Sequence, residues 1–118
     1  MEEVERLNEV SIDIDLDEQA DYIAIAQKIA LYRVICESGN NAIKHWQAKN
    51  IDVRLKLTDN SIELTVEDDG SGFSKDDKDF REGNGLRNMR SIAVLLKGFL
   101  SIVQRDKSGV RVRLSLPR

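Results

Sequence analysis

The chain has 118 residues, of which 41% are hydrophobic and 33% are charged, and its formal net charge is −3 at pH 7. This composition is typical of a soluble globular protein, and the length predicts that residues 1–118 form a single domain. The small acidic excess disfavours nucleic-acid binding, because that function requires a basic surface.

The chain carries no sequence signal for export or membrane insertion. No apolar run approaches the ~20 residues that a transmembrane helix needs. The acidic start, Met1-Glu2-Glu3, differs from the basic start of a signal peptide. The single cysteine, Cys36, cannot form an internal disulfide or a zinc cluster, which favours a reducing compartment. We therefore expect a cytoplasmic location, which is also compatible with a membrane-anchored parent protein.

The first half of the chain predicts a strand, a long helical region and a hairpin. Residues 10–16 alternate between apolar and polar side chains, which is the period of a half-buried strand. Residues from about 21 to 46 carry apolar side chains at helical spacing, which predicts one long helix or two helices separated near Leu31. Residues 51–57 and 62–67 alternate again around a turn, and we interpret them as a hairpin.

The second half predicts a loop, a helix and two strands. Residues 68–85 are polar and punctuated by glycines, and long ordered loops in small domains are usually functional. A helix is predicted over 86–97, with Gly98 at its C-terminal stop. Strands are predicted at 100–102 and 110–116. The fold class is therefore α/β: a two-layer sandwich with a mixed, mostly antiparallel five-stranded sheet and helices on one face.

Three clusters of residues could carry chemistry, and the first lies on the long helix. Glu37, Asn41 and Lys44 fall within about 60° of one another on one helix face. The amide oxygen suits a hydrated magnesium ion and the ammonium suits a phosphate chain. The carboxylate of Glu37 could orient or deprotonate a nucleophile. Taken alone, a solvated helix face gives the same pattern.

The other two clusters are rich in glycine. Asp68-Asp69-Gly70-Ser71-Gly72 follows a strand, where a carboxylate can accept a hydrogen bond from a purine amine and glycines allow close backbone approach. Gly83-Asn84-Gly85 opens the second helix, whose free N–H groups favour a phosphate. Neither cluster matches the dinucleotide-binding fingerprint or the P-loop. Taken alone, each is also compatible with a simple turn.

In this order, the clusters resemble the motifs of the GHKL ATPases and, within them, of the sensor histidine kinases. Glu37 to His45 resembles the N box, and Asp68, Gly70 and Gly72 resemble the first glycine box. Gly83 and Gly85 resemble the second glycine box. Leu31-Tyr32-Arg33 and Gly85-Leu86-Arg87-Asn88-Met89-Arg90 are similar to the kinases of the nitrate-sensor and lipid-sensor type. The resemblance covers residues from about 10 to 117.

The resemblance implies the Bergerat ATP-binding fold, with ATP and Mg²⁺ as cofactors. Asn41 would ligate magnesium, and Lys44 and His45 would lie at the phosphates. Glu37 would be the catalytic residue, acting as a base or orienting water for the attacking nucleophile. Asp68 would bind the adenine amine, with Gly70 and Gly72 shaping the pocket floor. The remaining implied ATP-binding residues are Gly83, Gly85 and Leu86, at the end of a short ATP lid formed by residues 74–82.

Three positions depart from the family pattern. Asn84 stands where a histidine is frequent, and Val110 replaces a threonine whose hydroxyl is expected beside the adenine pocket, which would weaken nucleotide binding. Gly39 replaces a bulkier apolar residue, at a helix cost of about 1 kcal/mol.

The resemblance also implies partners. His45 is the only histidine and belongs to the N box, so the phosphoacceptor histidine is expected on a dimerisation domain preceding residue 1. The isolated domain is expected to be a monomer that works with a downstream response regulator. Two alternatives stay open: an anti-sigma-factor serine kinase with the same boxes, and a degenerate nucleotide-binding module used for interaction. A gyrase, mismatch-repair or chaperone ATPase is disfavoured because no transducer domain follows.

Overall fold

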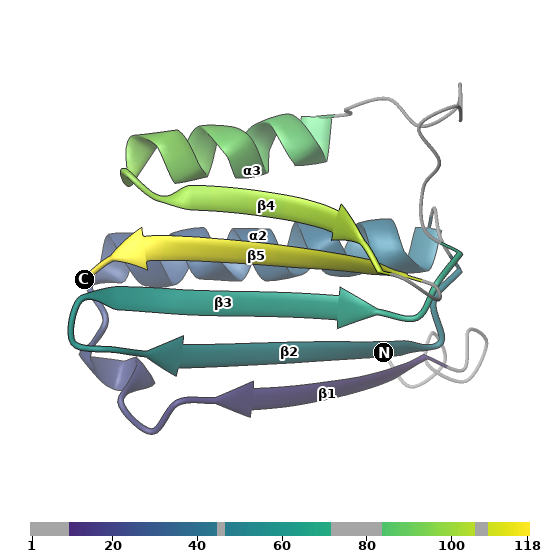
Figure 1. The fold of residues 1–118 in the computed structure, drawn as a ribbon, viewed down its shortest axis with the longest axis horizontal. Coiled ribbons are helices and arrows are strands. Elements are labelled where there is room, and N and C mark those ends of the chain that lie inside the picture. The colour runs from purple at the N-terminus through teal and green to yellow at the C-terminus, as the bar shows by residue number, and fades with distance from the viewer. Residues whose placement is uncertain (1–9, 45–46, 72–83, 106–108) are drawn as a thin grey trace.

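The computed structural model describes residues 10–44, 47–71, 84–105 and 109–118, and their elements follow the predicted order (Figure 1). The strands are β1 (Ser11–Leu16), β2 (Asn50–Leu57), β3 (Ser61–Asp68), β4 (Phe99–Gln104) and β5 (Val110–Pro117). The helices are the short 3-10 helix η1 (Ala20–Tyr22), α2 (Ile25–Lys44) and α3 (Asn84–Leu95). Of these helices, none combines the length and the apolar character that crossing a bilayer requires.

The five strands form one sheet in the order β1-β2-β3-β5-β4. β1 runs parallel to β2, and the other three pairings are antiparallel. The sheet is therefore mixed and mostly antiparallel, as predicted. α2 lies behind the sheet in the view of Figure 1, and α3 lies beside β4. This arrangement confirms the predicted two-layer sandwich.

The core lies between the sheet and the two helices, because each central strand turns every second side chain toward them. Along β2, β3 and β5 the buried positions alternate with polar ones, and these positions are Ile51, Val53, Leu55, Ile62, Leu64, Val66, Val110, Val112, Leu114 and Leu116. α2 contributes Leu31, Val34 and Ala42 to the same cluster.

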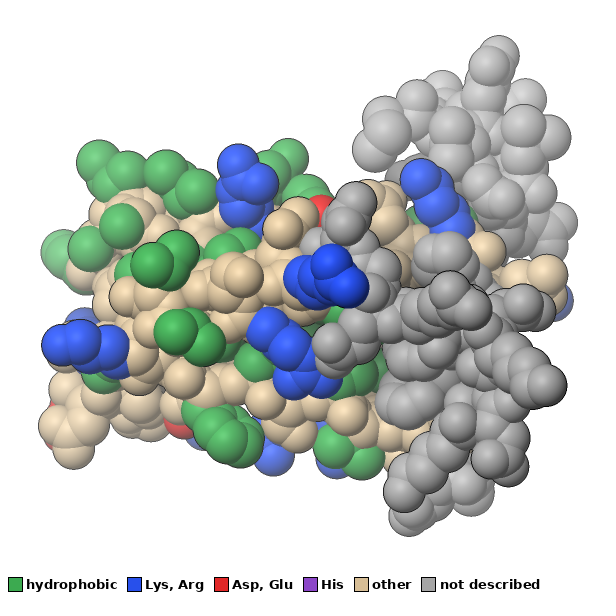
Figure 2. All heavy atoms as spheres, turned by 90° about the horizontal axis from the view of Figure 1, so that it is seen from above, with side chains coloured by type: hydrophobic (Ala, Val, Ile, Leu, Met, Phe, Trp, Pro, Cys, Tyr) green, Lys and Arg blue, Asp and Glu red, His purple; other side chains and the backbone are tan. Residues whose placement is uncertain are grey.

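α3 is amphipathic, and its two sides differ sharply in exposure. Leu86, Met89 and Ala93 are buried in the core. Val94 and Leu95 are 76% and 79% exposed, and apolar side chains are visible at the surface on this side of the molecule (Figure 2). α3 therefore packs on the core through only one stripe of side chains, as helical periodicity predicts.

Of the two alternatives for the helical region, one long helix is confirmed and a break near Leu31 is not. α2 runs unbroken through Leu31, whose side chain is 4% exposed and belongs to the core. The interruption occurs earlier, at Ile23, which is extended (φ −84°, ψ 140°) and buried between η1 and α2. Ile23 follows the helical spacing of its neighbours, so periodicity alone did not reveal that it leaves the helix.

Gly98 lies at the end of α3 but has a different role from the one predicted. The left-handed residue is Lys97 (φ 57°). The Lys97 N–H donates to the Val94 carbonyl at 3.1 Å and the Gly98 N–H donates to the Ala93 carbonyl at 2.7 Å, which is the Schellman pattern. A Cβ on Gly98 would lie 2.6 Å from the Ser115 carbonyl oxygen, so the glycine is needed where the chain enters β4 beside β5.

Candidate functional site

Four segments that carry the predicted site meet at one end of the sandwich: the last turns of α2, the end of β3, the start of α3 and the start of β5 (Figure 1). Hydrogen bonds hold this end together. The Ala48 N–H donates to the Ala42 carbonyl at 2.9 Å and turns the chain back after α2. The next residues, Lys49 and Asn50, bind Asp69 at the end of β3. The described residues of the three predicted clusters therefore share one end of the fold.

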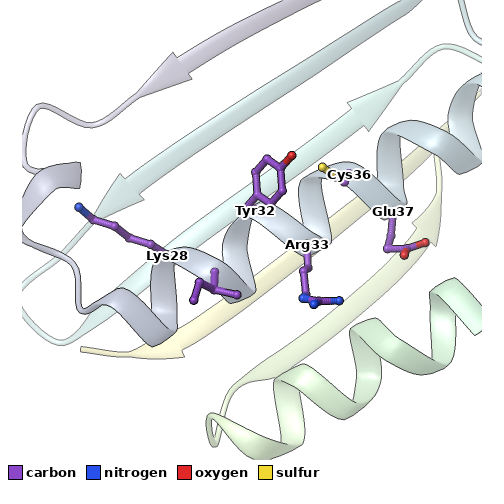
Figure 3. Close-up of a pocket in the computed structure, with 6 residues that line it drawn as sticks. Lys28, Tyr32, Arg33, Cys36 and Glu37 are labelled. Carbon is purple, nitrogen blue, oxygen red and sulfur yellow. The ribbon is translucent and has the colours of Figure 1, made fainter.

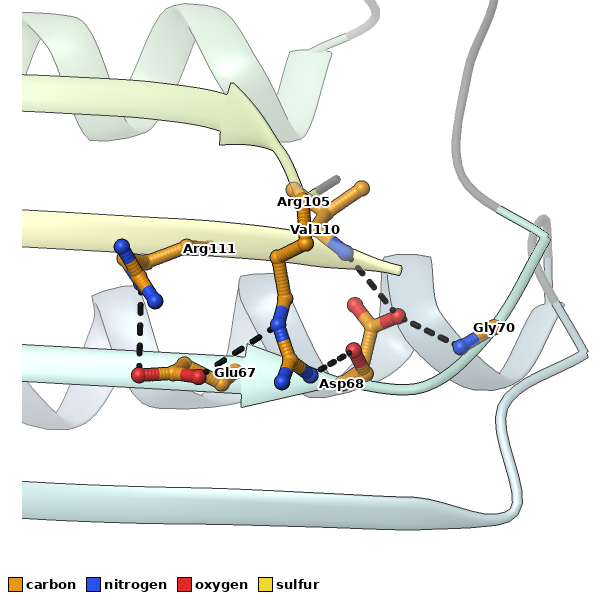
Figure 4. A network of polar contacts seen from close by, with 6 residues as sticks. All are labelled: Glu67, Asp68, Gly70, Arg105, Val110 and Arg111. Atoms are coloured by element: carbon orange, nitrogen blue, oxygen red, sulfur yellow. Dashed lines mark hydrogen bonds and ion pairs between the residues drawn. The ribbon is translucent and has the colours of Figure 1, made fainter. Parts of the chain in front are cut away.

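Asp68 is the buried carboxylate of this end, with 5% of its surface exposed. Its Oδ1 accepts hydrogen bonds from the Gly70 N–H at 2.8 Å and from the Val110 N–H at 3.3 Å (Figure 4). Burial raises the pKa of Asp68, although the two backbone hydrogen bonds act in the opposite direction. The carboxylate is thus fixed in orientation and held in a site that disfavours its charge.

The turn before β5 packs directly on the backbone of Asp68. Gly109 has φ 94°, and a Cβ there would overlap the Asp68 carbonyl oxygen. Arg105 also donates to this carbonyl, from Nη1 at 2.9 Å. Val110, which stands where a threonine is usual in the family, is fully buried next to this contact. Sequence reasoning noted Val110 but did not predict the close approach of Gly109 to the Asp68 backbone.

Asp69 follows Asp68 directly but lies in a different environment. Its Oδ1 accepts hydrogen bonds from the N–H groups of Lys49 and Asn50, each at 2.8 Å, and its Oδ2 accepts one from Asn50 Nδ2 at 2.7 Å. Burial raises the pKa of Asp69, but these hydrogen bonds outweigh it and the pKa is lowered. Asp69 therefore anchors the start of β2, a role that sequence reasoning missed because its partners lie about 20 residues away.

On α2, Glu37 and Asn41 are one turn apart and half-buried, whereas Lys44 is exposed. Figure 3 shows Glu37 and Arg33 pointing to the same side of α2, and Tyr32 and Cys36 pointing elsewhere. Glu37 borders a surface hollow of about 550 Å³. The helix thus presents a carboxylate that remains accessible beside the amide of Asn41.

Ser38, between Glu37 and Gly39, links the two helices of the site. Its Oγ donates to Met89 Sδ at 3.6 Å, and the two residues are 2% and 0% exposed. No pattern in the sequence signals this contact, because the partners are separated by 51 positions.

Part of the predicted site lies outside the described residues: His45, Gly72, Gly83 and the lid at 74–82. Gly85 and Leu86 lie in the first turn of α3. The Leu86 side chain is buried in the core, so its predicted contribution to phosphate binding would come from its backbone N–H. Gly70 is buried and contacts Asp68 as described above.

Comparison with known proteins identifies the family. Residues 26–118 match the family described as histidine kinase-, DNA gyrase B-, and HSP90-like ATPases. Sensor histidine kinase MctS of Rhizobium johnstonii is 31% identical over 111 residues, which are 92% of this chain and 24% of MctS. Signal transduction histidine-protein kinase/phosphatase UhpB of Salmonella typhimurium is 35% identical over 107 residues, which are 91% of this chain and 20% of UhpB. The chain therefore spans about a quarter or less of these relatives.

Solved structures share the fold. The blue-light activated histidine kinase of Erythrobacter litoralis EL346 superposes with a TM-score of 0.78 at 19% identity, covering 98% of this chain and 56% of that one. The catalytic domain of histidine kinase ThkA superposes with a TM-score of 0.75 at 18% identity, covering 98% of this chain and 83% of that one. The family match shows that the chain belongs to the histidine kinase-, DNA gyrase B-, and HSP90-like ATPases, and its relatives MctS and UhpB group it with the catalytic ATPase domains of histidine kinases.

Proposed function

We propose that this chain is the catalytic domain of a two-component sensor histidine kinase of the short-lid type, and that it holds Mg-ATP for phosphoryl transfer. The acceptor would be a histidine on a dimerisation domain, and the next recipient would be a response regulator. The observation that carries the proposal is the position of Asp68. It is a buried carboxylate, fixed by the Gly70 and Val110 N–H groups, at the end of the fold where α2 and α3 also present polar groups.

The donor groups at this end suit ATP. In the proposed site, Asp68 accepts a hydrogen bond from the adenine amine, and Gly70 and Gly72 shape the floor beneath the base. Lys44 and His45 lie at the phosphates, as do the backbone N–H groups at Gly83, Gly85 and Leu86. A helix N-terminus favours phosphate because its first N–H groups lack partners within the helix. Desolvating Asp68 is unfavourable, and a hydrogen-bond donor from the ligand would offset part of that cost.

The half-buried amide of Asn41 suits magnesium. This ion prefers a few protein oxygens, completed by water and phosphate oxygens. When bound, Mg-ATP supplies the transferable phosphoryl group and the cation that neutralises its charge.

Glu37 is the proposed catalytic residue. In its carboxylate form it would accept the proton of the attacking imidazole or orient that ring, while the burial of Ser38 fixes the backbone beside it.

We place the domain on the cytoplasmic side, where ATP is available, as one monomeric unit comprising residues 1–118.

The test is phosphotransfer from radiolabelled ATP to the parent protein's dimerisation domain supplied in trans. The wild-type chain is expected to label a histidine, and Glu37→Gln is expected to bind ATP but to transfer about 100 to 10,000 times more slowly. Transfer by Glu37→Gln at the wild-type rate would remove Glu37 from the mechanism. Nucleotide binding by the wild-type chain without any transfer would instead favour a degenerate interaction module, and an acid-stable phosphoserine on a partner would favour the serine kinase.

A further inference from the structure

The face of the sheet turned away from α2 carries a row of side chains in which a threonine lies between two arginines. Arg54 of β2 is in register with Thr65 of β3, and Thr65 is in register with Arg113 of β5. Thr65 stands between the buried Leu64 and Val66, which places the row on the open face. Neighbouring strands lie about 4.8 Å apart, so the two arginine backbones are about 10 Å apart with the threonine midway. We name Arg54, Thr65 and Arg113 the arginine row.

Other arginines on this face are already paired. Arg111 Nε lies 3.3 Å from Glu67 Oε1, and Arg105 Nε lies 3.5 Å from Glu67 Oε2 (Figure 4). Within the part of the chain that the structure describes, the side chains of Arg54 and Arg113 make no ion pair. The arginine row therefore holds two guanidinium groups that no carboxylate binds directly, although Asp15 of β1 is in register with Arg54 on the side away from Thr65.

The two carboxylates of β3 that flank Thr65 are engaged elsewhere. Glu67 binds Arg105 and Arg111, as described above. Glu63, two residues before Thr65, accepts hydrogen bonds at Oε1 from Ser115 Oγ at 3.0 Å and from Ser61 Oγ at 3.2 Å. Both carboxylates lie about 7 Å along β3 from Thr65. They would repel an extended polyanion but leave room for a compact anion between them.

A hollow of about 210 Å³ lies over the arginine row, lined by Arg54, Thr65, Glu67, Arg111 and Arg113. Guanidinium groups bind tetrahedral oxyanions through paired N–H donors, and the threonine hydroxyl adds a donor between them. We propose that the arginine row binds a phosphate group, either as free orthophosphate or as the phosphomonoester of a lipid headgroup. This site is separate from the proposed ATP site, because it lies on the open face of the sheet rather than at the end where α2, α3 and β3 meet.

The test is titration of the ¹⁵N-labelled chain with sodium orthophosphate at constant ionic strength, without nucleotide. The Thr65 amide and the Nε–H signals of Arg54 and Arg113 are expected to shift and saturate. The double variant Arg54→Gln/Arg113→Gln is expected to weaken the affinity by about tenfold or more. Lys56→Gln is the control, because it removes one positive charge from the same face of β2 beside Glu63, and it should change the affinity by less than about twofold.

The source of the phosphate is distinguished by vesicle co-sedimentation. Binding to phosphatidylcholine vesicles only when they contain phosphatidic acid, and loss of that binding in the double variant, would assign a lipid headgroup. Saturable orthophosphate binding without vesicle binding would assign free phosphate. Absence of saturation up to about 20 mM orthophosphate, or equal weakening in Lys56→Gln, would overturn the proposal. Unchanged circular dichroism of the variants would exclude misfolding as the cause, since all substituted side chains are exposed.

Discussion

Ser38 on α2 and Met89 on α3 are joined by a buried hydrogen bond of 3.6 Å from Oγ to Sδ. The serine adjoins Glu37, and Met89 lies one turn after Gly85, so this contact connects the two helices of the candidate site through the core. A sulfur acceptor is weak, and most of the stabilisation at this point comes from the complete burial of the methionine side chain.

Met89→Ala is therefore expected to lower the free energy of unfolding by about 2–5 kcal/mol, because it leaves a cavity between α2 and α3. Met89→Leu, which keeps the volume, should cost less than about 1.5 kcal/mol. Urea denaturation measures both. Val94→Ala is the control on the same helix, because Val94 is 76% exposed and the change should stay within about 0.5 kcal/mol. If Val94→Ala lowered the free energy of unfolding as much as Met89→Ala does, the assignment of Met89 to the core would be contradicted.

Gly39 gives a second prediction, in which the substitution is expected to stabilise the protein rather than to destabilise it. A Cβ at Gly39 meets nothing within 4 Å, whereas at Gly109 it would overlap the Asp68 carbonyl oxygen. Gly39→Ala should therefore stabilise the protein by about 0.5–1 kcal/mol, since alanine loses less backbone entropy in a helix. Gly109→Ala should destabilise it, because φ is 94° and the space is taken. Thermal unfolding of the two variants measures both changes in stability. Equal shifts in the melting temperature would contradict the predicted difference in sign.

Asp68 and Asp69 predict opposite dependences of stability on pH. The pKa of Asp68 is raised above its ordinary value of 3.8, so the folded state binds the proton more tightly than the unfolded state does. Its ionisation therefore costs stability, and this loss develops as pH rises from about 3.8 through the folded pKa. The pKa of Asp69 is lowered, so its contribution is present above pH 3.8 and is lost as pH falls through the folded pKa.

At pH 7, Asp68→Asn should thus raise the free energy of unfolding, and Asp69→Asn should lower it. The difference for Asp68→Asn should disappear as the pH falls from the raised folded pKa of Asp68 to about 3.8, whereas the difference for Asp69→Asn should shrink as the pH falls below 3.8. Urea denaturation at several pH values tests this. A gain in stability from Asp69→Asn at pH 7 would contradict the assigned anchoring role. A carboxylate that costs stability is also the kind of residue expected at a binding site.

The sequence predicted the sandwich because strand alternation and helical spacing are local signals. β2, β3 and β5 each bury every second residue, and this period is visible in the sequence. Helical spacing likewise placed Glu37 and Asn41 on one helix. The departure of Ile23 from the helix was not predictable, because its apolar side chain satisfies both an extended and a helical burial pattern.

The contacts that shape the site depend on residues distant in the chain. Ser38 pairs with Met89, Asp69 binds Lys49 and Asn50, and Gly109 packs against the Asp68 backbone. Each of these contacts depends on the overall fold rather than on neighbours in the sequence. The motifs therefore indicated candidate residues, and the long-range packing explains how Asp68 and Asp69 are separated into different environments.

The most direct test of the proposed ATP site is calorimetric titration of the wild-type chain and of Asp68→Asn with ATP and magnesium. The wild-type chain is expected to bind in the micromolar to millimolar range, about −8 to −4 kcal/mol. Asp68→Asn is expected to weaken binding by about 1–3 kcal/mol, because the buried adenine amine loses its acceptor, while the protein stays folded. Wild-type affinity in Asp68→Asn, or no binding by the wild-type chain at several millimolar ATP, would contradict the account.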